Sequence, residues 1–197
     1  MRRFMNVLVV GALLSVGTEA GAAEPVSTPP TVSTSPSSGF ELEWDPSVLL
    51  LQGFSAVAVY GPAALPQWRF GVDVFTFQLP GFQLQSGWQA RAFGASALVR
   101  FHPWGAPQGF WVAAMVRGGY WRYAYLDQGT GEVLDLSVIP RIGFNWYPFG
   151  LAGRFYVAPQ LGVAIPVLVS GVPTVGAESH PRLSPFPTPA VHLGWTF

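Results

Sequence analysis

The stretch from residue 134 to residue 166 limits the possible fold most narrowly, because its apolar side chains recur at every second position. The apolar faces of its two arms carry Leu136, Val138, Pro140, Ile142, Phe144 and Trp146, and then Phe155, Val157, Pro159, Leu161, Val163 and Ile165. Side chains alternate across a strand, so each arm has one apolar face and one small or polar face. Soluble strands average about 5–6 residues, whereas a tilted membrane-spanning strand needs about 9–11. The pattern therefore predicts a long hairpin of a transmembrane β-barrel.

The composition supports a closed barrel as the fold. Hydrophobic residues make up 50% of the chain and charged residues only 10%, against roughly 25% charged residues in soluble domains. No apolar run reaches the roughly 18 residues that a transmembrane helix requires. Because only helices and closed barrels satisfy every backbone group in lipid, we expect an all-β, antiparallel, up-and-down barrel. The formal net charge of +0 argues against a nucleic-acid partner.

The first 23 residues have the pattern of an export signal. Arg2 and Arg3 form a positive end, an apolar stretch spans 7–16, and small residues at 20–23 form a cleavage site. Residues 24–38 are rich in Pro, Ser and Thr, and we expect a disordered linker there. The sequence contains no Cys, which excludes a lipoprotein anchor and disulfides. The barrel is expected over 39–197.

Alternation and turn residues predict seven strands, at 48–60, 68–77, 88–102, 110–125, the two arms of the 134–166 hairpin, and 188–197. Bacterial barrels have an even number of strands. The eighth strand is either a short one at 40–44, before Asp45 and Pro46, or a strand hidden in 171–187; we favour the first. Two irregularities are also expected. One is a bulge at Phe75. The other is a register shift near Gly118 and Gly119, because Arg117 and Arg122 are an odd number of positions apart and would face opposite sides of a regular strand.

The last strand carries a more specific signal. It places four apolar residues on one face, Val191, Leu193, Trp195 and Phe197, and it ends on the aromatic Phe197. Together with the export signal and the alternating strands, this ending resembles the assembly signal of small, roughly eight-stranded bacterial outer-membrane β-barrels. The resemblance covers 48–197 by pattern and about the last ten residues by motif.

This resemblance implies a location and a topology. The mature chain would lie in the bacterial outer membrane, in contact with membrane lipid and lipopolysaccharide, after handling by the barrel-assembly machinery. The final strand would end in the periplasm. The turns at 103–109 and 149–153 would then be periplasmic, and the loops at 80–87, 126–133 and 171–187 would face outside.

The small and polar faces predict the contents of the lumen. The polar residues expected to face it are Asp73, Arg100, Arg117, Asp135, Arg141, Asn145, Gln160 and His192. The three arginines are long enough to reach across a narrow barrel and pair with Asp73 and Asp135. We therefore expect an Arg/Asp network that largely plugs the lumen. The alternative is a binding site or a narrow conduit.

No constellation of residues points to catalysis. The His residues, His102, His180 and His192, have no metal-ligand spacing, and we expect no cofactor and no metal. The favoured function is a non-enzymatic envelope role or a narrow conduit for small apolar solutes, which would escape sideways into the membrane. Two alternatives stay open. A lipid-modifying enzyme, similar to the outer-membrane lipid A deacylases, would need a Ser or Glu beside His192 on the lipid side. A soluble periplasmic binding barrel would stay in solution without detergent.

Overall fold

A computed structural model describes residues 38–105, 107–126, 128–180 and 184–197. The expected signal peptide at 1–23, and all of the expected linker except Ser38, lie outside the described residues. Within the described residues, no helix has the length and apolar character needed to cross a membrane.

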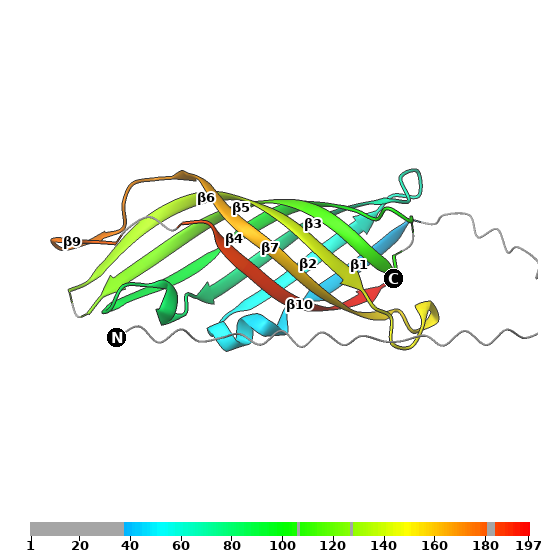
Figure 1. Cartoon of the computed structure of the whole chain (residues 1–197), viewed down its shortest axis with the longest axis horizontal. Coiled ribbons are helices and arrows are strands. Elements are labelled where there is room, and N and C mark those ends of the chain that lie inside the picture. Colours follow the sequence, from blue (N-terminus) through cyan, green and yellow to red (C-terminus); the bar gives the residue numbers. More distant parts are fainter. Residues whose placement is uncertain (1–37, 106, 127, 181–183) are drawn as a thin grey trace, which may run out of the picture. The chain divides into compact units, whose positions relative to one another are not determined.

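Eight antiparallel strands form a closed barrel in the order β1-β10-β7-β6-β5-β4-β3-β2 (Figure 1). Their bounds are β1 Gly39–Trp44, β2 Phe54–Gly61, β3 Trp68–Gln78, β4 Trp88–Phe101, β5 Gly109–Tyr125, β6 Thr130–Asn145, β7 Phe155–Val169 and β10 Phe186–Thr196. β1 closes the barrel by pairing with β10, from Glu41 opposite Thr196 to Trp44 opposite Leu193. The favoured eighth strand at 40–44 is therefore confirmed. The 171–187 region forms a separate hairpin, β8 Thr174–Val175 with β9 Glu178–Ser179, before β10 begins.

The strand predicted at 48–60 is wrong in its first half, where the chain forms the 3-10 helix η1, Pro46–Leu51. Asp45 caps this helix: its Oδ1 accepts a hydrogen bond from the Ser47 backbone N–H at 2.9 Å. Pro46 has no N–H to leave unsatisfied in the first turn. Gly53 then brings the chain close to β3, because a Cβ at this position would lie 2.1 Å from the Thr76 carbonyl oxygen. Because η1 and Gly53 interrupt the strand pattern, β1 ends at Trp44 and β2 begins only at Phe54.

The predicted alternation of the 134–166 hairpin is confirmed, and its apolar face points outward. Ile142, Phe144 and Leu161 are exposed on the outer wall, whereas Ser137 and Asn145 are buried inside. Exposed apolar side chains on all eight strands make a surface far more apolar than that of an ordinary soluble domain. The faces are therefore those of a barrel with an apolar exterior and a polar interior.

Both predicted irregularities are wrong. Phe75 keeps continuous register with β2 and β4 and points inward. β4 and β5 also pair without a shift, so Arg117 is buried inside while Arg122 faces outward. The register shift that the structure shows lies between β6 and β7, at Leu136 and Ser137.

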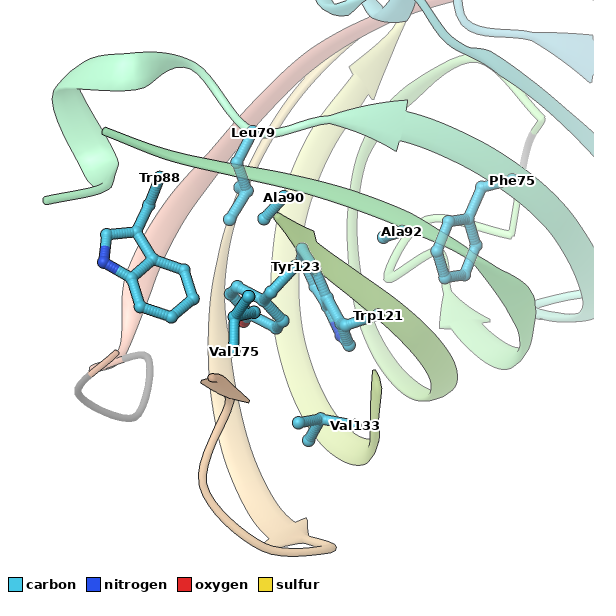
Figure 2. Close-up of a cluster of buried hydrophobic side chains, with 9 residues drawn as sticks. All are labelled: Phe75, Leu79, Trp88, Ala90, Ala92, Trp121, Tyr123, Val133 and Val175. Carbon is cyan, nitrogen blue, oxygen red and sulfur yellow. The ribbon is translucent and has the colours of Figure 1, made fainter. Parts of the chain in front are cut away.

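The end of the barrel opposite the C-terminus contains an apolar cluster, which we call the outer apolar cluster (Figure 2). Its buried members are Phe75, Leu79, Trp88, Ala90, Ala92, Trp121, Tyr123, Val133 and Val175. Val175 comes from the β8–β9 hairpin, which lies at this end of the barrel (Figure 1). The His180 ring packs against Trp88 with the ring centroids 5.2 Å apart. Aromatic side chains therefore fill the barrel interior at this end.

The assignment of faces predicts unequal effects of substitution. Ile142→Arg or Leu161→Arg would place a charge on the apolar exterior and is expected to lower the free energy of unfolding by about 2–4 kcal/mol if the site lies mid-membrane. Gln160→Asn on the inner face is expected to be milder. Urea titrations of the chain folded into lipid vesicles measure both, and equal tolerance at the two faces would mean that the barrel is inside out.

Candidate functional site

A buried group of polar side chains fills the barrel near the C-terminus, and we call it the inner polar cluster. Its members are Glu41 and Glu43 of β1, Arg100 of β4, Tyr156 of β7 and His192 of β10. Arg100 Nη1 and Nη2 donate to Glu43 Oε1 and Oε2 at 2.8 and 3.1 Å. His192 Nδ1 lies 2.7 Å from Glu43 Oε2. The bidentate Arg100–Glu43 pair is the strong form of a carboxylate–guanidinium contact, and it is buried inside the barrel.

Tyr156 links the two glutamates of the inner polar cluster. Its hydroxyl oxygen lies 2.8 Å from Glu41 Oε2 and 2.6 Å from Glu43 Oε1, and its single proton serves one acceptor at a time. Gly194 makes room for the ring, since a Cβ there would lie 2.1 Å from Tyr156 Cζ. Tyr147, in the turn before β7, packs on Tyr156 with the ring centroids 5.2 Å apart. Burial raises the pKa of the Tyr147 hydroxyl above its usual range.

Trp111 extends the inner polar cluster across the lumen. The Arg100 guanidinium carbon lies 4.2 Å from the Trp111 ring centroid. Trp111 Nε1 donates to Asn145 Oδ1 at 2.7 Å. Gly143 gives the ring its space, because a Cβ there would lie 2.3 Å from Trp111 Cζ2. Charged and aromatic groups together therefore occupy the lumen at this end.

The structure places all eight predicted lumen residues on the inner face of the barrel: Asp73, Arg100, Arg117, Asp135, Arg141, Asn145, Gln160 and His192. The predicted Arg/Asp pairing is wrong, however. Asp73 accepts from Ser55 Oγ at 3.0 Å and Ser96 Oγ at 3.3 Å. Asp135 accepts from Trp121 Nε1 and Ser137 Oγ. The plug is an Arg/Glu cluster, because the closure of the barrel brings β1 to Arg100 and keeps both aspartates among neutral donors.

Sequence reasoning missed Glu41 and Glu43, although a signal was present. In the segment Phe-Glu-Leu-Glu-Trp, at 40–44, the two acids alternate with three large apolar residues. The acids are buried inside, whereas Phe40 and Leu42 are exposed on the outer wall. Recognising 40–44 as a strand therefore also places its carboxylates in the lumen.

Arg117 and Arg141 are arranged differently from Arg100. Among the described residues, neither has a carboxylate oxygen within the 4.0 Å of an ion pair. Arg141 Nη1 donates to Gln160 Oε1 at 3.3 Å. The Arg117 guanidinium carbon lies 5.6 Å from the Phe75 ring centroid and 5.8 Å from that of Phe186. These two arginines line a cavity rather than forming part of the plug.

The cavity has a volume of about 270 Å³. Its inner lining includes Asp73, Phe75, Arg117, Arg141 and His192, and so lies between the outer apolar cluster and the inner polar cluster. Its lining also includes Pro187 and Pro189, which are exposed on the outer face of β10, together with Ser47 and Leu51 of η1. The cavity therefore reaches the outer wall between η1 and β10.

We call this gap in the wall the side opening. β10 pairs with β1 only from Leu193 to Thr196, so the edge at 186–192 faces η1 instead of a strand. The Phe197 N–H points toward β1 and donates to Phe40 O. The Thr196 N–H points to the opposite side of the strand and donates to Arg154 O. Amides alternate along a strand, so odd-numbered positions of β10 point their N–H toward the side opening. Pro187 and Pro189 occupy two of these positions and supply no N–H there.

Two segments that line the cavity at the surface, η1 and the loop after β3, expose large apolar side chains. Leu50 of η1 is 87% exposed and Phe82 of the loop after β3 is 86% exposed. Such large exposed side chains are unfavourable in water and are favourable against a membrane interior. The side opening is therefore suited to face lipid.

The environment of His192 bears on the enzyme alternative. Glu43 lies within hydrogen-bond distance of His192, but on the inner face, and His192 Nε2 lies 3.8 Å from Asp45 Oδ2. In the part of the chain that the structure describes, no Ser hydroxyl is hydrogen-bonded to His192, and no group of three or more His, Cys, Asp or Glu is arranged to hold a metal ion. The arrangement is a buried Glu–His pair.

The inner polar cluster generates a stability prediction. Glu43→Gln removes the carboxylate that is hydrogen-bonded to Arg100 and leaves the buried guanidinium only Glu41, whose Oε2 lies 3.8 Å from Arg100 Nη1, so we expect a loss of about 3–5 kcal/mol in the free energy of unfolding. Glu132→Gln is the matched control, because the Glu132–Arg122 pair is exposed, with side chains 48% and 60% accessible, and such pairs contribute about 0–1 kcal/mol. Urea unfolding in lipid vesicles compares the two, and equal losses would contradict the proposed importance of burial.

No protein-family model and no curated protein matches the chain. Among solved structures, the chain is similar to Neisserial surface protein A in its crystal structure, with a TM-score of 0.41 and 13% sequence identity. The match covers 81% of this chain and 96% of that one.

Proposed function

We propose that the mature chain is a small integral β-barrel of the bacterial outer membrane that takes up a small, largely apolar solute through its side opening. The observation that carries the proposal is the cavity of about 270 Å³, which lies between two filled ends of the barrel and reaches the outer wall. The solute would pass between the cavity and the membrane interior, sideways rather than along the barrel axis.

The distribution of side chains supports a membrane location. Val72, Ile142 and Leu161 are exposed on the outer wall, whereas Glu43, Arg100 and other charged groups are buried within. A soluble barrel has the reverse arrangement, with its polar face in water. The predicted export signal and the terminal Phe197 agree with an outer-membrane destination, where lipid and lipopolysaccharide would surround the barrel.

The filled ends favour a sideways route. An eight-stranded barrel is just wide enough for its own side chains, and here the inner polar cluster and the outer apolar cluster occupy the two ends. The side opening has a rim of exposed apolar residues that includes Leu50 and Phe82. A solute that dissolves in lipid would meet this rim directly.

The proposed role is non-enzymatic. His192 faces the interior, and its hydrogen-bond partner is a carboxylate, Glu43. A lipid hydrolase needs a nucleophile beside its base and within reach of the bilayer. A purely structural role in the envelope would need no cavity, so the cavity favours solute uptake over that role.

The location is tested by fractionating Gram-negative cells that express the full-length chain. The mature protein is expected in the outer-membrane fraction, because its exterior is apolar and its sequence carries an export signal. Recovery as a soluble periplasmic protein would overturn the proposal.

The cavity is tested with the neutral apolar fluorophore N-phenyl-1-naphthylamine and the folded chain in non-ionic detergent. Ala190→Trp adds a ring to a residue that lines the cavity, and it is expected to weaken probe binding at least tenfold. Val191→Trp is the matched control, because the next residue is 41% exposed and faces outward; it is expected to bind the probe as the wild type does.

Two results bear against this proposal. Equal probe binding by the Ala190→Trp variant and the wild type, with circular dichroism showing that both are folded, would mean that the cavity is not the binding site. A large and steady ion conductance of the wild type in planar bilayers would mean that the ends are not closed.

A further inference from the structure

The wall of the cavity carries buried hydrogen-bond donors that lack partners. Arg117 Nε and Nη2, Arg141 Nε and Thr188 Oγ1 are buried without a hydrogen bond, and all three residues line the cavity. Buried polar groups are almost always satisfied, and leaving one unsatisfied costs roughly 1–3 kcal/mol. Two of these residues can only donate, and the Thr188 hydroxyl can donate as well. The missing partner is therefore a hydrogen-bond acceptor.

The charges around the two arginines point to an anionic acceptor. Arg117 and Arg141 repel one another, and the acids that attract them, Asp45, Asp73 and Asp135, lie beyond ion-pair distance. All three aspartates are already held by neutral donors: Asp45 by Ser47, Asp73 by Ser55 and Ser96, and Asp135 by Trp121 and Ser137. An anion between the guanidinium groups would supply the opposite charge that no described carboxylate brings within ion-pair distance of either arginine.

The rest of the cavity is suited to an apolar chain. The Arg117 guanidinium contacts the rings of Phe75 and Phe186, which also line the cavity. The lining continues through Leu51 of η1 to the side opening. At about 270 Å³, the cavity is slightly smaller than typical ligand sites, which range over roughly 300–1,000 Å³. It accommodates an anionic head and the first part of one chain, and it is too small for the headgroup and two chains of a phospholipid.

We infer that the ligand is a single-chain carboxylate, that is, a fatty acid, whose carboxylate accepts hydrogen bonds from Arg117, Arg141 and Thr188 while its chain leaves through the side opening into the membrane. This inference rests on the proposed function, because it requires the side opening to face lipid. It adds the chemical class of the solute and names the residues that select it.

The test compares two ligands with the same chain, dodecanoate and dodecan-1-ol, as competitors of bound N-phenyl-1-naphthylamine. It uses the full mature chain in non-ionic detergent, at a pH where the acid is ionised. For the wild type, dodecanoate is expected to displace the probe at a concentration at least tenfold lower than dodecan-1-ol. Arg117→Gln and Arg141→Gln are each expected to remove most of this preference and to leave displacement by dodecan-1-ol unchanged.

Arg122→Gln is the matched control. Arg122 lies on the same strand as Arg117, but it faces outward and pairs with Glu132 at 3.3 Å. The variant is expected to keep the full preference for dodecanoate. Because every variant is measured in the same micelles, each ligand partitions into detergent to the same extent for all variants, so a change in preference between the wild type and a variant reports on the protein.

The outcomes separate this inference from the proposed function. Equal displacement by the two ligands in the wild type, or a preference that survives in folded Arg117→Gln and Arg141→Gln, would overturn the carboxylate assignment while leaving the cavity as an apolar site. A diacyl phospholipid that displaces the probe as well as dodecanoate does would overturn the single-chain assignment. If circular dichroism shows that an arginine variant does not fold, Thr188→Val replaces it: a reduced preference supports the inference and an unchanged one contradicts it.

Discussion

The early end of β1 determines most of the remaining structure. In a closed barrel every strand must pair on both sides, yet β1 has only six residues, Gly39–Trp44, before Asp45 and Pro46 turn the chain into η1. Where β1 exists, it closes the wall and carries Glu41 and Glu43 to Arg100. Where it is replaced by η1, the edge of β10 stays unpaired and the cavity reaches the exterior. The plug and the side opening are therefore two results of one short strand.

The interior balances large groups against small ones. A lumen bounded by eight strands has little spare volume, so the rings of Trp111 and Tyr156 require Gly143 and Gly194 opposite them. Both rings contact the Glu43–Arg100 pair: the Trp111 ring packs against the Arg100 guanidinium, and the Tyr156 hydroxyl lies within hydrogen-bond distance of Glu43. Arg117 and Arg141 have no ion-paired carboxylate among the described residues, and the cavity lies beside them, so the interior is filled at its ends and hollow between them.

The sequence predicted the faces of the barrel better than its contacts. The two-residue period of 134–166 depends only on local strand geometry, so the predicted faces agree with the observed ones wherever the strand is continuous. The apolar run at 48–51 fits a strand as well as a 3-10 helix, and the Asp-Pro pair before it was the discriminating signal. The partner of Arg100 depends on how β1 meets β4 across the closed lumen, a relationship between residues far apart in sequence. No pattern along the chain contains that information, and the same holds for the cavity.

The seam between β1 and β10 has a mechanical consequence. Its ladder contains four residue pairs, from Glu41–Thr196 to Trp44–Leu193, and the ladder between β5 and β6 contains sixteen. When the barrel opens locally, we expect the two strands with the shortest ladder of residue pairs to separate first. Glu43 and His192 stand on the two strands of this seam and are joined by a hydrogen bond of 2.7 Å. This side-chain bond adds to the short backbone ladder and limits how far the side opening can widen toward the end of the barrel near the C-terminus.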